Sequence, residues 1–254
     1  MASFSGKTAL IVGGSHGIGF STAQLLIKHG TKVLITGRST APIKAAHENL
    51  GDKAKVVPCD IRSIAAISDL VQTAKSYFGA GKSIDLLFIN AGYAALEAFT
   101  QVSEESYRRH FDTNVFGTFF VAQKLAPMVK NGGSIVFTTS VSNQVGFPGM
   151  AIYSATKAAV QSFVQTIAAE LASQQIRVNA VAPGFVKTPT MGVADSSPAE
   201  LKEFEGKGAQ TTPLGRIGEP EEIAKAVVFL AFEASFMTGS QLVLDGGLGS
   251  LKLH

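Results

Sequence analysis

Short apolar runs alternate with longer amphipathic segments along almost the whole chain, and this alternation constrains the fold more than any other feature. Most of the runs are apolar nearly throughout, which is typical of parallel strands covered on both faces of a sheet. The longer segments have helical patterns, as in βαβ units. We expect strands at residues 8–12, 32–36, 54–58, 85–89, 134–139, 177–182 and 241–245. We expect helices at about 17–29, 40–50, 63–79, 103–130, 150–173 and 219–232.

This order of elements predicts an α/β protein with a Rossmann-like, doubly wound parallel sheet of about seven strands and helices on both faces. A chain of 254 residues with 46% hydrophobic content is long and apolar enough to bury a substantial core. Neither a linker nor an internal repeat divides it, so we predict a single domain over residues 1–254.

Cysteine usage and apolar run length indicate the compartment. The single cysteine, Cys59, excludes an internal disulfide, and we expect it as a small apolar residue at a strand end. The longest apolar runs, such as residues 226–232, are far too short to cross a bilayer. The first residues show no pattern of a secretion signal. We therefore expect a cytoplasmic protein without membrane contact.

The net charge of +3 is weak and spread along the chain, which argues against a nucleic-acid partner. Residues 1–47 nevertheless contain no Asp or Glu, which is either chance or the mark of a site for a highly negative ligand. The histidines lack metal-ligand spacing, so we expect no metal site. The basic run Arg108, Arg109 and His110 is expected on a solvent face or at a subunit contact.

The segment 187–215 interrupts the alternation because it is rich in Pro, Gly, Thr and Ser. Inside it, Ser197 and Glu200 have the spacing of a capping box, and Pro198 suits a first helical turn. A small helix in a long loop late in an α/β domain suggests a substrate lid. A surface insertion without such a role is the alternative.

A glycine-rich turn joins the first strand to the first helix. Gly13, Gly17 and Gly19 allow a tight turn, and the backbone N–H groups at the helix start attract a pyrophosphate. The turn also contains the candidate cofactor contacts Ser15, His16 and Ile18. Arg38 and Ser39 follow the second strand, where NAD binders usually have a carboxylate. Because Arg38 can pair with a 2′-phosphate, we predict NADP(H) as the cofactor.

The stretch YSATK places Tyr153 and Lys157 on one face of a helix. An ordinary tyrosine, with a pKa of about 10, is poorly matched to proton transfer at neutral pH, and a nearby ammonium lowers that pKa. The pair alone is a weak motif. Ser140 ends a strand upstream of Tyr153, and Asn114 lies in the preceding long helix. Together with the pair, these polar residues suit carbonyl chemistry.

With these motifs in this order, the sequence resembles the short-chain dehydrogenase/reductase family over nearly its whole length, from the glycine turn to the C-terminal TGSQLVLDGG. The resemblance implies that Tyr153 is the catalytic acid/base and that Lys157 lowers its pKa and binds the nicotinamide ribose. It implies that Ser140 binds the substrate oxygen, and that Asn114 holds a water in a proton relay.

The resemblance also implies further cofactor contacts. Asp60 and Ile61 match positions beside the adenine. A second group matches the end of strand four and the segment around the nicotinamide: Asn90, Ala91, Gly92, Pro183, Gly184, Val186 and Thr188. Relatives often form tetramers or dimers through residues 103–130, 150–173 and the C-terminal strand region, so we expect a homo-oligomer. The tail from residue 246 onward is a candidate for crossing to another subunit.

Two positions depart from the family pattern. Val12 stands where Thr is common before the first glycine, and Ile89 replaces the first Asn of the NNAG motif. Both changes put β-branched apolar residues on strands one and four, which we expect to be neighbours. Our hypothesis is that Val12 and Ile89 form an apolar contact in place of a polar brace.

The substrate side is specified only broadly. Candidate pocket residues are mainly apolar: Val141, Ser142, Gln144, Phe147, Phe185, Met191, Val193 and Phe204. Such a pocket suits a ketone or secondary alcohol of moderate size. We therefore predict an NADP(H)-dependent carbonyl reductase or alcohol dehydrogenase. The alternatives are a 3-ketoacyl-carrier reductase of lipid synthesis and a catalytically idle NADP-binding sensor.

Overall fold

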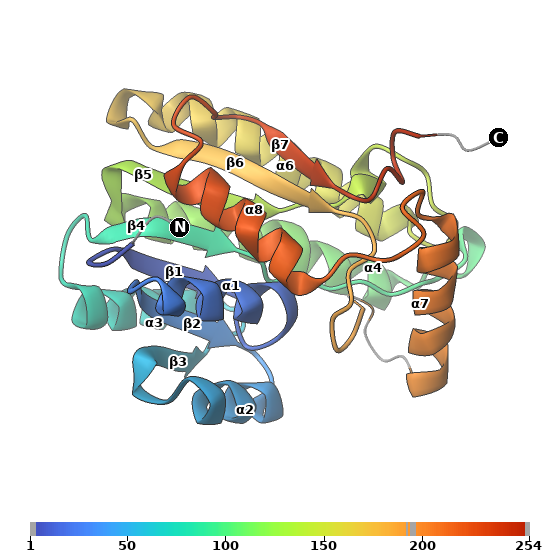
Figure 1. Cartoon of the computed structure of the whole chain (residues 1–254), viewed down its shortest axis with the longest axis horizontal. Helices are drawn as coiled ribbons and strands as arrows, with labels where there is room; N and C mark the ends of the chain where they lie inside the picture. The colour runs from blue at the N-terminus through green and yellow to red at the C-terminus, as the bar shows by residue number, and fades with distance from the viewer. Residues whose placement is uncertain (1–3, 192, 194–196, 252–254) are drawn as a thin grey trace.

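The structure is a computed structural model that describes residues 4–191, 193 and 197–251. Its seven strands form one parallel sheet in the order β3–β2–β1–β4–β5–β6–β7 (Figure 1). The expected doubly wound α/β fold is thereby confirmed. The strands are β1 (Thr8–Val12), β2 (Lys32–Gly37), β3 (Ala54–Pro58), β4 (Ile84–Ile89), β5 (Val129–Thr138), β6 (Arg177–Pro183) and β7 (Gln241–Leu244).

Helices cover both faces of the sheet. One face carries α1 (Gly17–Lys28), α2 (Thr40–Leu50) and α8 (Pro220–Phe232). The other carries α3 (Ile64–Phe78), α5 (Thr118–Leu125) and α6 (Ala151–Leu171), with α4 (Glu104–Phe111) beside α6. The remaining helix, α7 (Pro198–Thr211), lies beyond the carboxyl ends of the strands, on the right of Figure 1.

The core consists of two apolar clusters separated by the sheet. Successive strand residues point to opposite faces, so Leu10 and Val12 pack in one cluster while Ala9 and Ile11 pack in the other. All four are fully buried. This two-sided burial is the reason why the strands read as unbroken apolar runs.

The strand order reverses between β1 and β4, and this reversal positions the site. From β1 the chain winds outward to β2 and β3, and then returns to β4 on the other side of β1. The connections after β1 and β4 therefore leave in opposite directions and open a crevice at the carboxyl ends of these strands. Ligands of doubly wound sheets bind in such a crevice.

The hypothesis about Val12 and Ile89 is confirmed. The two residues are register partners on the adjacent strands β1 and β4. Both are buried and belong to the same apolar cluster. They therefore meet on one face of the sheet directly below the crevice.

The prediction of one helix over residues 103–130 is wrong in two respects. The helix is interrupted by a π-helical segment, η3 (Asp112–Gly117), which contains Asn114. Such wide turns occur where the hydrogen bonds of a side chain do not fit a regular helix. In addition, β5 already begins at Val129, which pairs with Ile84 before a register shift. Gly132 and Gly133 belong to this strand, which was expected only from residue 134 onward.

The basic run at residues 108–110 does not lie on one solvent face, which corrects the expectation. Arg108 is exposed and ion-paired with Glu104, but His110 is buried, with 1% of its surface exposed. The Nε2 atom of His110 accepts a hydrogen bond from the Ala95 amide at 3.1 Å. His110 therefore links α4 to the loop that follows β4.

Two smaller predictions are confirmed. Ser197 and Glu200 form a capping box at the start of α7. Cys59 is buried directly after β3, and burial raises the pKa of its thiol to about 11. The lid proposed at 187–215 contains residues 192 and 194–196, which lie outside the described residues.

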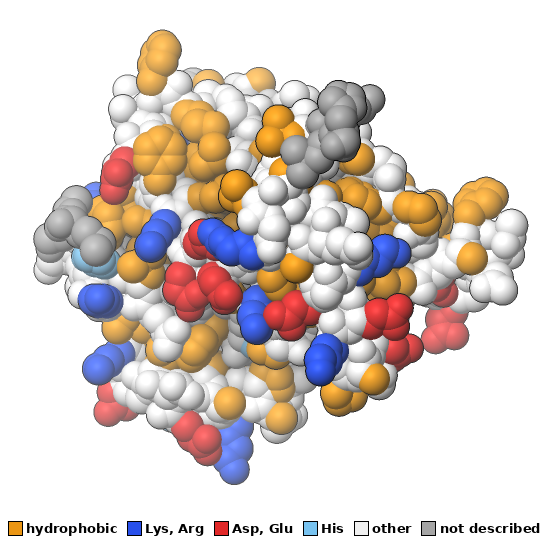
Figure 2. Space-filling view, turned by 45° about the vertical axis from the view of Figure 1, so that its right-hand side comes forward, with side chains coloured by type: hydrophobic (Ala, Val, Ile, Leu, Met, Phe, Trp, Pro, Cys, Tyr) orange, Lys and Arg blue, Asp and Glu red, His pale blue; other side chains and the backbone are white. Residues whose placement is uncertain are grey.

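Acidic and basic side chains are interspersed over the face that Figure 2 shows. Within the described part of the chain, no helix has the length and apolar character needed to span a membrane.

The amino ends of the central strands are joined by Asp85, on the edge of the sheet opposite the crevice. Its carboxylate is 3.2 Å from Lys7 Nζ and 2.7 Å from Lys130 Nζ, and it accepts hydrogen bonds from both the backbone and the side chain of Thr8. Burial raises the pKa of Asp85, but the hydrogen bonds from Lys130, Thr8 and Lys7 outweigh burial and hold it below its ordinary value.

We predict that Asp85→Asn lowers the free energy of unfolding by about 2–3 kcal/mol near neutral pH, because two ammonium groups and Thr8 lose a charged acceptor. A lowered pKa stabilises the fold above the unfolded-state pKa of about 3.9, and this contribution is lost as pH falls through the folded pKa. The difference between wild type and variant in urea unfolding should therefore shrink in acid.

The matched control is Glu48→Gln, which removes an exposed carboxylate 3.9 Å from Lys44. Its effect should stay within about 0.5 kcal/mol. Equal stabilities of wild type and Asp85→Asn near neutral pH would contradict the role given to Asp85.

Candidate active site

The glycine turn after β1 leads directly into the start of α1. Gly13 and Gly17 have φ values of +83° and +56°, which favour glycine. A Cβ on Gly19 would lie 2.1 Å from the Gly13 carbonyl oxygen, so the turn cannot close around a larger residue. His16 precedes α1 without capping it through its side chain, and no acidic residue occupies the first turn. The N–H groups at this end of α1 are thus oriented to receive a phosphate.

Arg38 and Ser39 lie beside this turn. Both side chains are exposed directly after β2. A Cβ on Gly37 would lie 2.5 Å from Ser15 Oγ, which shows that Ser15 of the turn packs onto the end of β2. Residues 37–39 therefore border the glycine turn.

Asp60 and Ile61 follow β3 at the same edge of the sheet. The Asp60 carboxylate is paired with the Arg62 guanidinium at 2.6 Å, and this hydrogen bond holds the pKa of Asp60 below its ordinary value. Ile61 is buried against Gly117 of η3. Arg62 was not among the predicted residues. Its position two residues after Asp60 is the signal that could have indicated it.

Asn90 braces the crevice from within. Its Nδ2 atom donates to the Gly13 carbonyl at 2.8 Å, and its Oδ1 atom accepts from Thr138 Oγ1 at 2.9 Å. The amide thus ties the glycine turn to the end of β5. Ala91 lies against Gly13, since a Cβ on Gly13 would be 2.6 Å from the Ala91 nitrogen.

The four predicted catalytic residues gather at the carboxyl ends of β4 and β5. Ser140 follows β5, while Tyr153 and Lys157 lie in the first turns of α6. The Lys157 Nζ atom is 5.6 Å from the centre of the Tyr153 ring and donates to the Thr138 carbonyl at 2.8 Å. A Cβ on Gly92 would lie 3.4 Å from Lys157 Nζ and 3.6 Å from Asn114 Oδ1, so Gly92 separates these two side chains.

Asn114 is fully buried, and its amide is engaged on three sides. The Nδ2 atom donates to the Tyr93 carbonyl at 2.8 Å and to Thr156 Oγ1 at 3.0 Å. The Oδ1 atom accepts from the Tyr93 amide at 2.7 Å. Asn114 therefore fastens the segment after β4 to α6, close to Tyr153 and Lys157.

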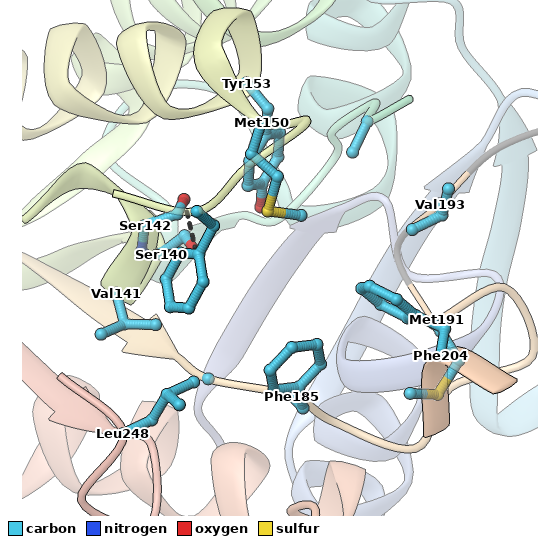
Figure 3. Close-up of a pocket in the computed structure, with 13 residues that line it drawn as sticks. Ser140, Val141, Ser142, Met150, Tyr153, Phe185, Met191, Val193, Phe204 and Leu248 are labelled. Atoms are coloured by element: carbon cyan, nitrogen blue, oxygen red, sulfur yellow. Dashed lines mark hydrogen bonds between the residues drawn. The ribbon is translucent and has the colours of Figure 1, made fainter. Parts of the chain in front are cut away.

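Ser142 controls the hydrogen bonds of Ser140. The Ser140 Oγ atom accepts from the Ser142 amide at 3.2 Å and from the Ser142 hydroxyl at 3.0 Å, the contact dashed in Figure 3. A hydroxyl has two acceptor sites and one proton. With both acceptor sites used, the Ser140 proton is left for a group on the Tyr153 side.

Burial sets the protonation states of the pair on α6. It raises the pKa of Tyr153 to about 12, and the hydrogen bond with Ser140 lowers it in part. Burial also lowers the pKa of Lys157 to about 8. Burial is the larger of the two influences on the Tyr153 phenol, and Lys157 Nζ is directed to the Thr138 carbonyl.

The segment after β6 crosses the mouth of the crevice. Pro183 ends β6, and Gly184 lies so close to Asp245 that a Cβ would be 2.9 Å from the Asp245 Cα atom. Val186 is buried, and the side chain of Thr188 contacts Gly17 of the glycine turn. The predicted nicotinamide segment and the phosphate turn are thus neighbours.

A pocket of about 480 Å³, open mouth included, leads from the surface to Tyr153 and Ser140. Figure 3 shows Tyr153 and Phe185 on opposite sides of this space. Of the predicted pocket residues only Gln144 does not line it. The described residues that line it are Ala94, Ser140, Val141, Ser142, Phe147, Met150, Tyr153, Gly184, Phe185, Met191, Val193, Phe204 and Leu248.

Ala94, Met150 and Leu248 were not predicted. Met150 directly precedes α6, and its place beside the YSATK motif was an available signal. Leu248 is far from the other lining residues in sequence and reaches the pocket because the Asp245 carboxylate accepts the amides of Gly247 and Gly249. The described part of the tail, up to residue 251, thus packs on its own chain.

The donor set fits a dinucleotide and gives no sign of a metal. Among the described residues, no group of three His, Cys, Asp or Glu side chains could hold a metal ion. Thr188 of the segment after β6 lies against Gly17 of the glycine turn, and the same segment lines the pocket at Gly184 and Phe185.

The comparisons with known proteins agree with this geometry. Residues 12–249 match the family model described as enoyl-(acyl carrier protein) reductase. An uncharacterized oxidoreductase of Methylorubrum extorquens is 38% identical over 98% of this chain and 100% of that protein. The 3-oxoacyl-[acyl-carrier-protein] reductase of Chlamydia muridarum is 38% identical over 95% of this chain and 97% of its own.

Solved structures give the same result. A short-chain dehydrogenase/reductase family protein superposes with a TM-score of 0.85 at 37% identity, covering 98% of this chain and 100% of the other. The 3-ketoacyl-(acyl-carrier-protein) reductase of Brucella melitensis, complexed with NADH, has a TM-score of 0.87 at 32% identity, covering 97% and 100%. The chain belongs to the short-chain dehydrogenase/reductase family of oxidoreductases.

Proposed function

We propose that the protein is an NADP(H)-dependent carbonyl reductase, which runs in reverse as an alcohol dehydrogenase. One observation carries the proposal. The hydroxyls of Tyr153 and Ser140 line an apolar pocket, and the Lys157 ammonium lies 5.6 Å from the centre of the Tyr153 ring. This arrangement suits proton transfer to a carbonyl oxygen whose carbon receives a hydride.

In the proposed reaction, the nicotinamide supplies the hydride when it is bound. Tyr153 gives its proton to the substrate oxygen as the C–O double bond becomes single. The Ser140 proton, directed by Ser142, forms a hydrogen bond to the same oxygen and stabilises the developing negative charge. Lys157 stabilises the phenolate that remains on Tyr153. Burial raises the pKa of Tyr153 to about 12, so the phenol holds its proton at neutral pH until the substrate oxygen takes it.

We assign Asn114 a positioning role in this scheme. Its side-chain amide is used within the protein, so it holds the backbone beside Gly92 and Thr156 of α6 in place. A water relay to Lys157 would then depend on the wide turn of η3 and not on a free Asn114 amide.

The cofactor contacts that we propose line the crevice from the glycine turn to the pocket. Arg38 and Ser39 favour NADP(H) because a guanidinium and a hydroxyl suit a 2′-phosphate, and because Asp60, a nearby carboxylate, is already paired with Arg62. The proposed set is Gly13, Ser15, His16, Gly17, Ile18, Gly19, Arg38, Ser39, Asp60, Ile61, Asn90, Ala91, Gly92, Tyr153, Lys157, Pro183, Gly184, Val186 and Thr188.

A second candidate is reduction of a 3-ketoacyl group on a carrier. It is favoured by the match to relatives described as acyl-carrier-protein reductases. An idle NADP-binding sensor is the third candidate, and it leaves the convergence of Tyr153, Ser140 and Lys157 without a function.

We also propose that residues 187–215 form a lid, that the protein is a homo-oligomer, a tetramer or a dimer, and that it works in the cytoplasm. Exposed apolar side chains on α8 and β7, Phe229 and Val243, support an oligomer.

Tyr153→Phe tests the proposed chemistry. We expect kcat for ketone reduction to fall by at least ~100-fold, because a positioned acid contributes about that much. NADPH binding should stay within about threefold, since only a hydroxyl is removed. NADPH consumption and NADPH fluorescence titration measure the two quantities. Tyr107→Phe, on the exposed surface of α4, is the matched control. Undiminished turnover by Tyr153→Phe would contradict the mechanism, and a wild type that binds NADPH without turning over any ketone would favour the sensor.

The pH dependence tests Lys157. With a pKa of about 8 in the chain without ligand, Lys157 loses its ammonium as pH rises, so kcat/KM for reduction should fall above about pH 8. Lys157→Arg should move this fall to higher pH, because a guanidinium keeps its charge. Lys225→Arg, on the exposed face of α8, should leave the profile unchanged. A wild-type profile that is flat to about pH 10 would rule out this role.

Cofactor choice is tested by Arg38→Ser. Loss of charge-assisted hydrogen bonds to a 2′-phosphate should weaken NADPH binding by about 10–100-fold, while NADH binding changes by less than about threefold. Lys44→Ser, at an exposed position on α2, controls for a general loss of positive charge. A wild type that binds NADH as tightly as NADPH would contradict the prediction.

A further inference from the structure

Among the described residues, polar side chains line the pocket at one end only. The three hydroxyls of Ser140, Ser142 and Tyr153 lie together, and no other described lining residue has a polar or charged side chain. A phosphate, a carboxylate or a sugar hydroxyl placed farther out would lose water without gaining a partner, which is costly. The substrate therefore carries its carbonyl at one end and apolar surface at the other.

Three phenylalanines from three separate segments form the outer wall. Phe147 follows β5, Phe185 follows β6, and Phe204 lies on α7. The rings of Phe185 and Phe204 have centres 5.0 Å apart at 67°, and those of Phe147 and Phe185 are 6.5 Å apart at 79°. All three are only partly buried, so ring surface remains for a ligand. Edge-to-face sets of this kind accept a further aromatic ring.

The position of the Phe185 ring is fixed by α7. A Cβ on Gly208 would lie 2.7 Å from Phe185 Cγ, so a larger residue there would push α7 away from the ring. An ion pair of 3.0 Å between Lys187 and Glu205 joins the same two segments. The aromatic wall is thus held in place before any ligand arrives, which lowers the entropic cost of binding.

Two methionines complete the apolar wall. Met150 and Met191 both line the pocket, and Figure 3 shows Met150 beside Tyr153 and Met191 beside Phe204. Met191 has a φ of +48°, a backbone conformation that residues with side chains rarely adopt. Thioether groups make favourable contacts with the edges of aromatic rings. They add to the preference for a flat ring in this space.

We propose that the site takes ketones that carry an aromatic ring fused to, or directly beside, the carbonyl-bearing part of the molecule. The ring lies against Phe147, Phe185 and Phe204, and the carbonyl oxygen reaches Tyr153 and Ser140. This inference rests on the proposed carbonyl reductase function and narrows its substrate class.

The test compares two ketones of the same carbon skeleton. In 2-tetralone an aromatic ring is fused beside an unconjugated carbonyl, and in 2-decalone the same ring is saturated. We expect kcat/KM with NADPH to be at least about tenfold higher for 2-tetralone, since two or three aromatic contacts each contribute to its binding. The N-acetylcysteamine thioester of acetoacetate, a mimic of a carrier-bound substrate, should be poorer than 2-tetralone.

Variants locate the preference. Phe204→Leu retains an apolar side chain without a ring, and it should bring the tetralone-to-decalone ratio down toward one. Phe204→Tyr, which keeps the ring, should preserve the ratio. Phe99→Leu, 79% exposed and outside the pocket lining, is the matched control and should leave the ratio unchanged. A ratio that is unaffected by Phe204→Leu would overturn the assignment of the ring to this wall.

The outcomes separate this inference from the proposed function. If 2-decalone or the thioester is reduced as well as 2-tetralone, the aromatic preference is overturned while the reductase function stands. If no ketone is reduced, calorimetric titration of the NADPH complex with 2-tetralone decides. Binding of 2-tetralone over 2-decalone would then support aromatic recognition and overturn the reductase function, and the absence of binding would overturn both.

Discussion

The side-chain amide of Asn90 joins the two halves of the site. It donates to Gly13 in the turn that offers the phosphate site, and it accepts from Thr138, which ends the strand leading to Ser140. The Thr138 carbonyl in turn accepts from Lys157. One short chain of hydrogen bonds thereby fixes the distance between the cofactor end and the proton-transfer end. The buried pair of Val12 and Ile89 lies directly below it, so the brace is polar at the crevice and apolar inside the sheet.

Burial has opposite consequences for the two titratable groups of the site. Desolvation disfavours charge, so it raises the pKa of Tyr153 and lowers that of Lys157. The Tyr153 phenol therefore keeps its proton at neutral pH. Lys157 is the group whose pKa lies closer to neutral pH. Ser140 reduces the shift at Tyr153 because its proton, left over by the two bonds from Ser142, is directed to that side. Burial in the pocket keeps the proton on the Tyr153 phenol, and the apolar wall of the pocket selects the substrates that reach this phenol.

The sequence was sufficient for the parts of the fold that depend on local periodicity. Strands such as β1 and β4 read as apolar runs because both of their faces are buried, and the capping box of α7 is a contact between residues three apart. The π-helical turn at Asn114 was not predicted, because it depends on bonds from Asn114 to Tyr93 and Thr156, which are distant in sequence. For the same reason Leu248 was missed in the pocket. The bond from Lys157 to the Thr138 carbonyl was not predicted either, because the number of residues between Tyr153 and Lys157 does not determine where the Lys157 ammonium points.

The central claim is that a hydride enters a carbonyl carbon at the place where Tyr153, Ser140 and Lys157 meet. The most direct measurement uses NADPH deuterated at the transferable C4 position together with a ketone, and mass spectrometry and NMR of the product alcohol. The account predicts one deuterium on the carbinol carbon of the alcohol and none elsewhere. An alcohol without deuterium at that carbon, or NADPH oxidation without formation of the alcohol, would contradict it.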